Sequence, residues 1–222
     1  MQKFQNLVRI AEHNDWVIIT LLICMFTYSL MFISLLRGVR FWDFFMEKFS
    51  EASNIFLSWL IVSTVFCVVL SVLVSQYVPI VPKTITDIRF GDFELNKFGY
   101  TFLCLSIFYL FKVGLSYIFY AGIGNARKWS RFYFVNTKFY FGFSVALMIL
   151  CIVHYYFEID KREAFKIYFY SFSLIFVFKQ FFSLFNVNKI LPEKWYYKIL
   201  YICTLQIAPF FALWKLLFFS NF

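Results

Sequence analysis

The sequence predicts an all-α, polytopic membrane protein with about six transmembrane helices. Hydrophobic residues make up 62% of the 222 residues and charged residues only 15%, whereas about a quarter of the residues of a soluble domain are charged. The mean hydropathy is +0.74, and the apolar residues come in long blocks. Each block approaches the roughly 20 residues that a helix needs to cross the hydrocarbon core, whereas a membrane barrel would show alternating segments of about ten residues. We therefore expect one transmembrane domain over residues 1–222.

The first expected span, residues 16–36, is followed by a short interfacial helix. The span begins after the polar stretch that ends at Asp15 and ends at Arg37. It has no small-residue cleavage site after it, which favours a retained span over a signal peptide. Residues 41–54 then alternate large apolar side chains with charged ones, a pattern typical of an amphipathic helix lying in the membrane interface.

The second expected span, residues 55–78, ends at two prolines, Pro79 and Pro82. Proline cannot donate the backbone hydrogen bond that a continuing helix requires. The connection that follows alternates polar and apolar residues over 83–90, which indicates a short extended or hairpin element outside the membrane.

A basic segment without acidic residues connects the third expected span, residues 98–120, to the fourth, residues 139–157. We expect this segment to form a cytoplasmic loop, because loops rich in Lys and Arg stay on the cytoplasmic side. The two termini and the loop at 79–97 would then face the exterior. The basic residues of the segment are Arg127, Lys128, Arg131 and Lys138.

The last two expected spans cover residues 167–187 and 198–219. The aromatic residues at 195–197 are typical of an anchor in the membrane interface. Pro209 removes one backbone hydrogen bond inside the last span, so we expect a helix kink there. An even number of spans places both termini on the same side of the membrane.

The most informative residues inside the expected spans are Lys112, Lys179 and Gln206. A charge at mid-bilayer costs about 2.5 to 3.5 kcal/mol on insertion scales. Their positions along spans of alternating direction place all three in the same half of the bilayer. One interpretation is a polar cluster that contacts a partner's acidic residue, a lipid headgroup or an anion. The other is that the lysine stems run along their helices to the interface and that Gln206 satisfies a carbonyl freed by Pro209.

The remaining residues favour no catalytic or cofactor chemistry. No Asp or Glu lies inside an expected span, which argues against a proton relay. Two histidines at different depths do not make a haem site, and the five cysteines, one in each of five spans, suit apolar packing. We predict no catalytic residue, no metal site and no cofactor. The formal charge of +9 lies mainly between spans, where it suits lipid headgroups and not nucleic acid.

The segment from Ile199 to Pro209, with the sequence ILYICTLQIAP, resembles the carboxyl-terminal signature of a known family. This is the Bacteroidota integral membrane family catalogued as domain of unknown function 4271, whose signature is a leucine-tyrosine-leucine-cysteine motif, then glutamate, then proline. Asp15 and Trp16 are similar to the start of the family. Gln206 stands where the family has the glutamate, so this chain keeps hydrogen bonding at that position and loses an acid.

The resemblance implies a Bacteroidota inner-membrane protein with an accessory role in the cell envelope or in secretion. Together with the absence of catalytic motifs, it makes a non-enzymatic subunit or scaffold of a multiprotein envelope or secretion assembly the leading hypothesis. Its partners would be the lipid bilayer and other envelope or secretion proteins. The alternative is a small transporter or a lipid- or anion-handling protein that uses Lys112 and Lys179.

Overall fold

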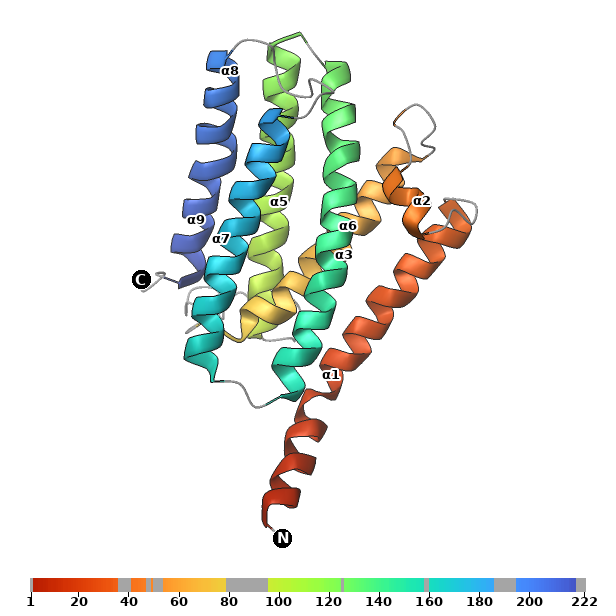
Figure 1. Cartoon of the computed structure of the whole chain (residues 1–222), viewed down its shortest axis with the longest axis vertical. Coiled ribbons are helices and arrows are strands. Elements are labelled where there is room, and N and C mark those ends of the chain that lie inside the picture. Colours follow the sequence, from red (N-terminus) through yellow and green to blue (C-terminus); the bar gives the residue numbers. More distant parts are fainter. Residues whose placement is uncertain are drawn as a thin grey trace. The chain divides into compact units, whose positions relative to one another are not determined.

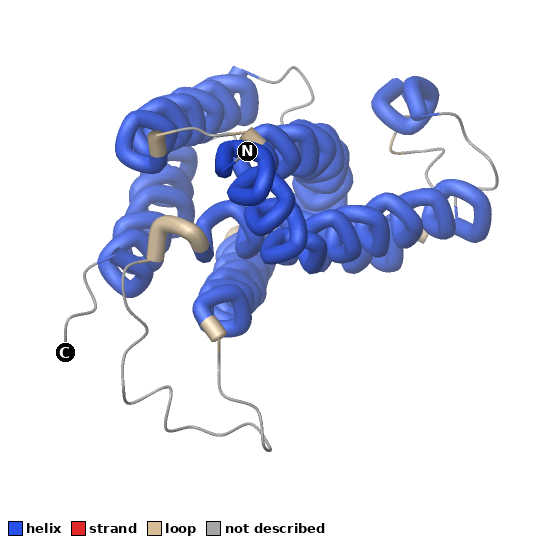
Figure 2. Tube along the Cα trace, turned by 90° about the horizontal axis from the view of Figure 1, so that it is seen from below, coloured by secondary structure: helices blue, strands red, loops and turns tan. Residues whose placement is uncertain are grey.

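The computed structural model describes residues 2–35, 41–46, 49, 54–78, 96–124, 126–157, 160–185 and 195–218. Regular secondary structure in these ranges is helical (Figures 1 and 2). The predicted all-α class is therefore confirmed. The expected extended element at 83–90 lies outside the described residues. Within the expected interfacial helix at 41–54, residues 47–48 and 50–53 also lie outside them, and Phe41–Met46 forms the short helix α2.

The long helices coincide with the expected spans. Five stretches are long and apolar enough to cross a membrane: Asp15–Leu35, Ile55–Ser75, Lys97–Gly122, Lys128–Tyr156 and Tyr196–Leu217. The fifth expected span, residues 167–187, falls largely in a helix of 25 residues, α7, which is not among these five. The chain is therefore a multi-pass membrane protein by helix length and hydropathy. The helices are α1 (Gln2–Leu30), the π-helix η1 (Met31–Leu35), α3 (Ile55–Ser75), α5 (Lys97–Gly122), α6 (Ala126–Tyr156), α7 (Lys161–Phe185), α8 (Trp195–Leu200), the π-helix η2 (Tyr201–Ile207) and α9 (Ala208–Phe218).

Several helices begin earlier than expected, and the early start of α6 corrects a prediction. Helix α1 begins at Gln2 and not near residue 16. Helix α6 begins at Ala126, so the four residues Arg127, Lys128, Arg131 and Lys138 lie in a helix and not in a loop. The chain from 126 to 138 contains no glycine or proline that would break a helix, and the turn is made by Gly124, whose φ is 75°.

The length of α6 reconciles its basic start with a membrane span. Its 31 residues extend about 46 Å at 1.5 Å per residue, which exceeds a hydrocarbon core of about 30 Å. The amino-terminal turns of α6 can therefore reach the headgroup region, where cationic side chains are favourable. Their cytoplasmic location stays a prediction.

The chain divides into two compact units. Unit 1 comprises Met1–Leu73 and Phe134–Ile159, and unit 2 comprises Val74–Tyr133 and Asp160–Phe222. The boundaries fall inside α3 and α6, so each of these helices contributes to both units. The prediction of a single transmembrane domain stays a prediction.

In unit 1, one stripe of α1 is buried. Its buried residues recur at alternating spacings of four and three, which places them on one face of a helix: Val17, Leu21, Cys24, Tyr28 and Met31. The opposite face exposes large apolar side chains such as Phe26, which is 63% exposed. This division is expected of a helix with one face against the protein and the other against lipid.

Helix α6 packs against both α1 and α3 in unit 1. Trp16 contacts Tyr155 at a ring separation of 6.0 Å, and Tyr28 contacts Phe141 at 4.9 Å, so α1 and α6 are antiparallel. The Tyr155 hydroxyl donates to the carbonyl of Val72 at 2.9 Å. Together with the contact of Phe66 and Tyr140 at 4.8 Å, this makes α3 parallel to α6. These directions are those of spans one, two and four in a chain that alternates across a membrane.

In unit 2, α5 and α7 both run antiparallel to the continuous segment α8–η2–α9 (Figure 1). Near one end of α5, the Tyr100 hydroxyl donates to the carbonyl of Leu216 at 3.3 Å. Near the other end, Phe119 contacts Tyr201 at 5.3 Å. Helix α7 contacts α9 where Phe176 stacks on Phe210 at 5.3 Å. Helices α5 and α7 therefore point in the same direction, as expected of spans three and five.

Candidate intramembrane polar site

The π-helix η2 holds a buried hydrogen bond between Gln206 and Tyr201. The side-chain amide Nε2 of Gln206 donates to the Tyr201 hydroxyl at 2.9 Å, and the two residues are only 2% and 1% exposed. Residues five apart in an α-helix point about 140° away from each other. In a π-helix the backbone pairs residues five apart, as the bond from the Ala208 N–H to the Cys203 carbonyl shows. The π-helix therefore brings the two side chains to the same face.

Pro209 gives a physical reason for this irregular backbone. It is the second residue of α9 and follows η2 directly. In a regular α-helix, the proline ring would clash with the carbonyl of Leu205, and no N–H would be present to bond to it. Widening the preceding turn relieves this clash. The structure shows a π-helix over Tyr201–Ile207, just before the proline, and the predicted kink at Pro209 stays a prediction.

Aromatic rings surround the Tyr201 side chain. Its ring lies 5.3 to 5.9 Å from three others, those of Phe119, Tyr120 and Phe132. The effective dielectric in such surroundings is low, which strengthens the hydrogen bond to Gln206 and makes an unpaired polar group costly. The aromatic ring set and the role of Tyr201 were missed in the sequence. The spacing of five between Tyr201 and Gln206 indicates a pairing only once the π-helix is known.

The helix register places Lys112 at the level of Gln206. Helices α5 and α9 are antiparallel, with Tyr100 opposite Leu216 and Phe119 opposite Tyr201. Counting residues along the two antiparallel segments from one contact to the other places Lys112 opposite Gln206. The sequence prediction that the two residues lie in the same half of the bilayer stays a prediction.

Lys112 also lies on the buried stripe of α5. It follows buried Tyr109 by three residues and precedes buried Ser116 by four, so the three share one helix face. Lys112 is half-buried, whereas Leu110 and Phe111 beside it are 63% and 61% exposed. Lys112 is therefore less exposed than Leu110 and Phe111, as expected of a position that faces protein.

Lys179 has an equivalent position on α7. It follows Phe176 by three residues, and Phe176 stacks on Phe210 of α9. Continuing the antiparallel register from this contact places Lys179 within one turn of Gln206. Lys179 is half-buried, whereas Phe178 is 67% exposed. Both lysines thus lie on the protein-facing stripes of their helices, which favours the polar-cluster interpretation over lipid-facing lysines. That the three residues act together stays a prediction.

Of the four basic residues in α6, Lys138 has a defined structural role in unit 1. Its Nζ donates to the carbonyl of Phe45 at 3.1 Å and lies 4.4 Å from the ring of Phe134 and 5.8 Å from the ring of Phe44. Lys138 therefore ties α2 to α6. Arg131 is exposed and Lys128 is half-buried, while the side chain of Arg127 is outside the described ones.

A second buried polar contact, also missed in the sequence, lies in unit 1. The hydroxyls of Tyr28 and Ser144 are 2.5 Å apart, and the Ser144 hydroxyl donates to the carbonyl of Phe141 at 2.7 Å. Since the serine proton is directed to that carbonyl, Tyr28 is the donor to Ser144. The sequence feature that could have indicated this contact is the position of Tyr28 among the apolar residues on one face of α1.

Seven further hydroxyls in the described helices bond to their own backbone. Each donates to a carbonyl three or four residues earlier, as seen at Thr20, Thr27, Ser29, Thr64, Ser71, Thr101 and Thr204. Three of the five cysteines, Cys24, Cys67 and Cys151, are buried. Within the described ranges, no three His, Cys, Asp or Glu residues lie together, and the absence of a metal site stays a prediction.

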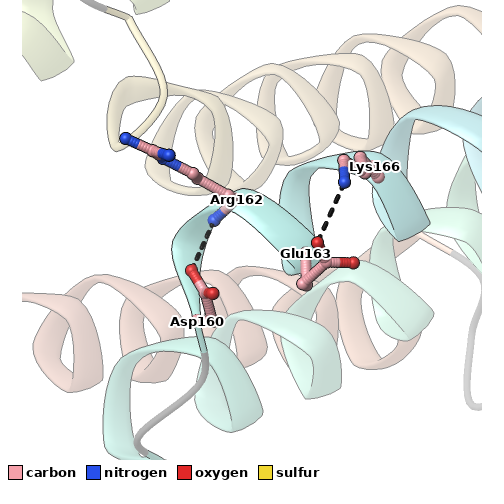
Figure 3. Close-up of polar contacts among 4 residues, drawn as sticks. All are labelled: Asp160, Arg162, Glu163 and Lys166. Carbon is pink, nitrogen blue, oxygen red and sulfur yellow. Dashed lines mark hydrogen bonds and ion pairs between the residues drawn. The ribbon is translucent and has the colours of Figure 1, made fainter.

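The charged start of α7 explains why this helix begins before its apolar segment (Figure 3). The Asp160 carboxylate accepts from the backbone N–H of Arg162 at 3.0 Å, which satisfies one of the free amides at a helix start. Lys166 pairs with Glu163 at 2.9 Å, and both side chains are more than 60% exposed. Such an exposed pair adds little stability. The first turns of α7 therefore form a capped, polar extension of the expected span.

Helix lengths, exposed apolar faces and polar residues on inner stripes define a multi-pass α-helical membrane protein. Residues 16–217 match the model of the family described as Domain of unknown function (DUF4271). The chain belongs to this family, which confirms the resemblance noted from residues 199–209. No curated protein and no solved structure matched the chain.

Proposed function

We propose that this protein is a non-enzymatic subunit or scaffold of a multiprotein cell-envelope or secretion assembly in the bacterial inner membrane. The observation that carries the proposal is the position of Lys112 and Lys179 on inner helix stripes near the depth of buried Gln206. Charges kept inside membrane spans usually serve a contact or a pathway, because they are costly to insert. Here they provide a contact for an acidic or lipid partner.

The hydrogen bonds of the hydroxyl groups support a structural role over a catalytic one. A serine nucleophile needs a base within hydrogen-bond reach. Ser71 and Ser144 are buried, and their hydroxyls donate to backbone carbonyls at 2.6 and 2.7 Å. The hydroxyl protons of these two serines are therefore engaged in hydrogen bonds to backbone carbonyls, which leaves both side chains poorly placed to act as nucleophiles.

The test is co-purification from the native membrane. The tagged full-length chain would be extracted in polymer nanodiscs and its partners quantified by mass spectrometry, with an unrelated tagged multi-pass protein of similar abundance as control. We expect one or more envelope or secretion proteins at near-stoichiometric ratio. Recovery of the chain alone under several gentle extraction conditions would contradict the subunit role.

A small transporter or a lipid- or anion-handling protein is the second candidate. It is favoured by the same inner-stripe positions, because a lysine facing protein is better placed to line a binding site than a lysine facing lipid. This candidate predicts that Lys112→Met and Lys179→Met each remove the cellular phenotype of the gene while the protein still inserts. Normal growth of both variants under conditions where the deletion strain is impaired would exclude it.

A further inference from the structure

We propose that unit 2 binds a phosphate-type oxyanion at the level of Gln206, with the ammonium groups of Lys112 and Lys179 as its cationic contacts. The inference rests on the proposed role of this level as a contact site and names the chemistry of what is bound. It concerns a phosphate group, carried either by a lipid headgroup or by a soluble phosphate.

The first argument is the shared level of the two lysines. The register from Tyr100 and Phe119 places Lys112 opposite Gln206, and the register from Phe176 places Lys179 within a turn of it. Both α5 and α7 contact the same segment, η2–α9. Two positive charges at one depth in a medium of low dielectric repel each other, and an anion at that depth turns this repulsion into attraction.

The second argument is the charge of the surroundings. The described helices of unit 2 carry no Asp or Glu between Lys97 and Gly122, or between Lys166 and Phe185, or between Trp195 and Phe218. An oxyanion bound at mid-helix therefore meets no carboxylate from these segments that would repel it. Gln206, at the same level, is neutral and adds no negative charge there, and its amide Nε2 donates to the Tyr201 hydroxyl.

The third argument concerns the geometry of the donors. An ammonium group is a compact point charge with three donors and is an established phosphate ligand in proteins. The hydrogen bond from Gln206 to Tyr201, at 2.9 Å, fixes the amide in the buried π-helix. Because the amide is fixed, the interior of the helices is polar and ordered at the depth of Gln206. A bound phosphate there would need little further ordering of the protein.

The test uses the purified full-length chain in nanodiscs of phosphatidylcholine. Two probes are added separately, phosphatidylglycerol in the bilayer and inorganic phosphate in the buffer, and binding is measured by native mass spectrometry and by thermal shift. The variants are Lys112→Met and Lys179→Met. The matched control is Lys215→Met, because Lys215 is an exposed lysine of α9 in the same unit.

We expect one probe to bind in a one-to-one ratio, and each of the two variants to weaken it about tenfold or more, since a charged hydrogen-bond partner is lost. Lys215→Met should change binding by less than about twofold, as expected of an exposed charge. Binding of phosphatidylglycerol would identify a lipid source, and binding of phosphate a soluble one. Lys179→Arg, which keeps the charge, should retain most of the affinity and serves as the check on folding.

The proposal is overturned if the parent protein binds neither probe, or if Lys215→Met weakens binding as much as the other two variants. Its failure is distinguishable from failure of the proposed function. A chain that co-purifies with envelope proteins but binds no phosphate probe would keep the subunit role and lose the oxyanion site. A chain that binds phosphate but purifies alone would keep the oxyanion site and lose the subunit role.

Discussion

Unit 1 and unit 2 hold their helices together with different side chains. In unit 1, the stripe of α1 is apolar or weakly polar, and polar contacts end on hydroxyls or backbone carbonyls, as with Tyr28 and Ser144 or Tyr155 and Val72. In unit 2, a ring of aromatic residues surrounds a hydrogen-bonded amide and phenol, Gln206 and Tyr201. The two lysines of the candidate polar site, Lys112 and Lys179, are also in unit 2. The comparison indicates that unit 1 is built for packing and that unit 2 carries the costly polar groups.

This difference has an energetic consequence. A packing unit loses stability mainly when buried volume is removed. A unit with a buried polar pair loses stability when one partner of the pair is removed, because the other is then left unsatisfied. The following predictions test the contrast from the largest expected effect to the smallest.

The largest effect is expected for Phe141→Ala in unit 1. Phe141 is 1% exposed, and its ring contacts those of Tyr28, Phe32 and Phe44 at 4.9, 5.5 and 5.3 Å. Replacing a buried phenylalanine by alanine costs about 3 to 5 kcal/mol of unfolding free energy. The measurement is a denaturant titration of the purified chain in mild detergent.

The control for this variant is Phe26→Ala in the same unit. Phe26 lies on the exposed face of α1 and is 63% exposed, so its removal leaves no internal cavity, and we expect a change of about 0.5 kcal/mol or less. Equal losses for the two variants would show that α1 and α6 do not pack through Phe141.

The helical class and most helix positions were predictable because membrane insertion imposes a simple pattern. About 20 consecutive apolar residues are needed for each span, and a proline or glycine placed between two such blocks marks where one helix stops. The span ending at Pro79 and the turn at Gly124 show this directly. Where the chain leaves the hydrocarbon core, this constraint ends, so the early starts of α1 and α6 were not predicted.

The sequence indicates which residues belong to the candidate site but not how they are arranged. Alternating span directions are enough to place Lys112, Lys179 and Gln206 in one half of the bilayer. The helix face that each occupies depends on which neighbours it packs against, and the sequence does not give that. The pairing of Gln206 with Tyr201 depends on a π-helix, which periodicity of 3.6 residues cannot reveal. The role of Lys138 was missed because it depends on α2, a contact 93 residues distant in the chain.

The second-largest effect is expected for the hydrogen-bonded pair of unit 2, Gln206 and Tyr201. Gln206→Leu leaves the Tyr201 hydroxyl buried without its amide donor, and we expect a loss of about 1 to 2 kcal/mol. A double-mutant cycle with Tyr201→Phe separates the pair from changes in packing. The expected coupling is about 0.6 to 1.7 kcal/mol, the range for polar contacts inside membrane proteins. Fully additive losses would mean that the hydrogen bond contributes nothing to stability.

The third-largest effect is expected for Lys138, which links α2 to α6. Lys138→Met removes the hydrogen bond to the Phe45 carbonyl and the contact with the Phe134 ring. A partly buried cation–π contact is worth about 0.5 to 2 kcal/mol, so hydrogen exchange in Phe41–Met46 should become faster while exchange in α9 stays the same. Lys215→Met is the control. Unchanged exchange in α2 would show that the aromatic contacts hold it without the lysine.

The smallest effect is expected for Tyr28→Phe in unit 1, and it sharpens the comparison most directly. Tyr28 donates to Ser144, but Ser144 donates in turn to the carbonyl of Phe141, so the serine keeps a partner when the phenol is lost. The phenylalanine ring retains the contact with Phe141 at the same place on α1. We therefore expect a loss of about 0.6 kcal/mol, the average for such contacts in membranes, against about 1 to 2 kcal/mol for Gln206→Leu. If Tyr28→Phe proved as costly as Gln206→Leu in the same denaturant titration, buried polar pairs would matter equally in both units, and the assignment of a packing role to unit 1 would be wrong.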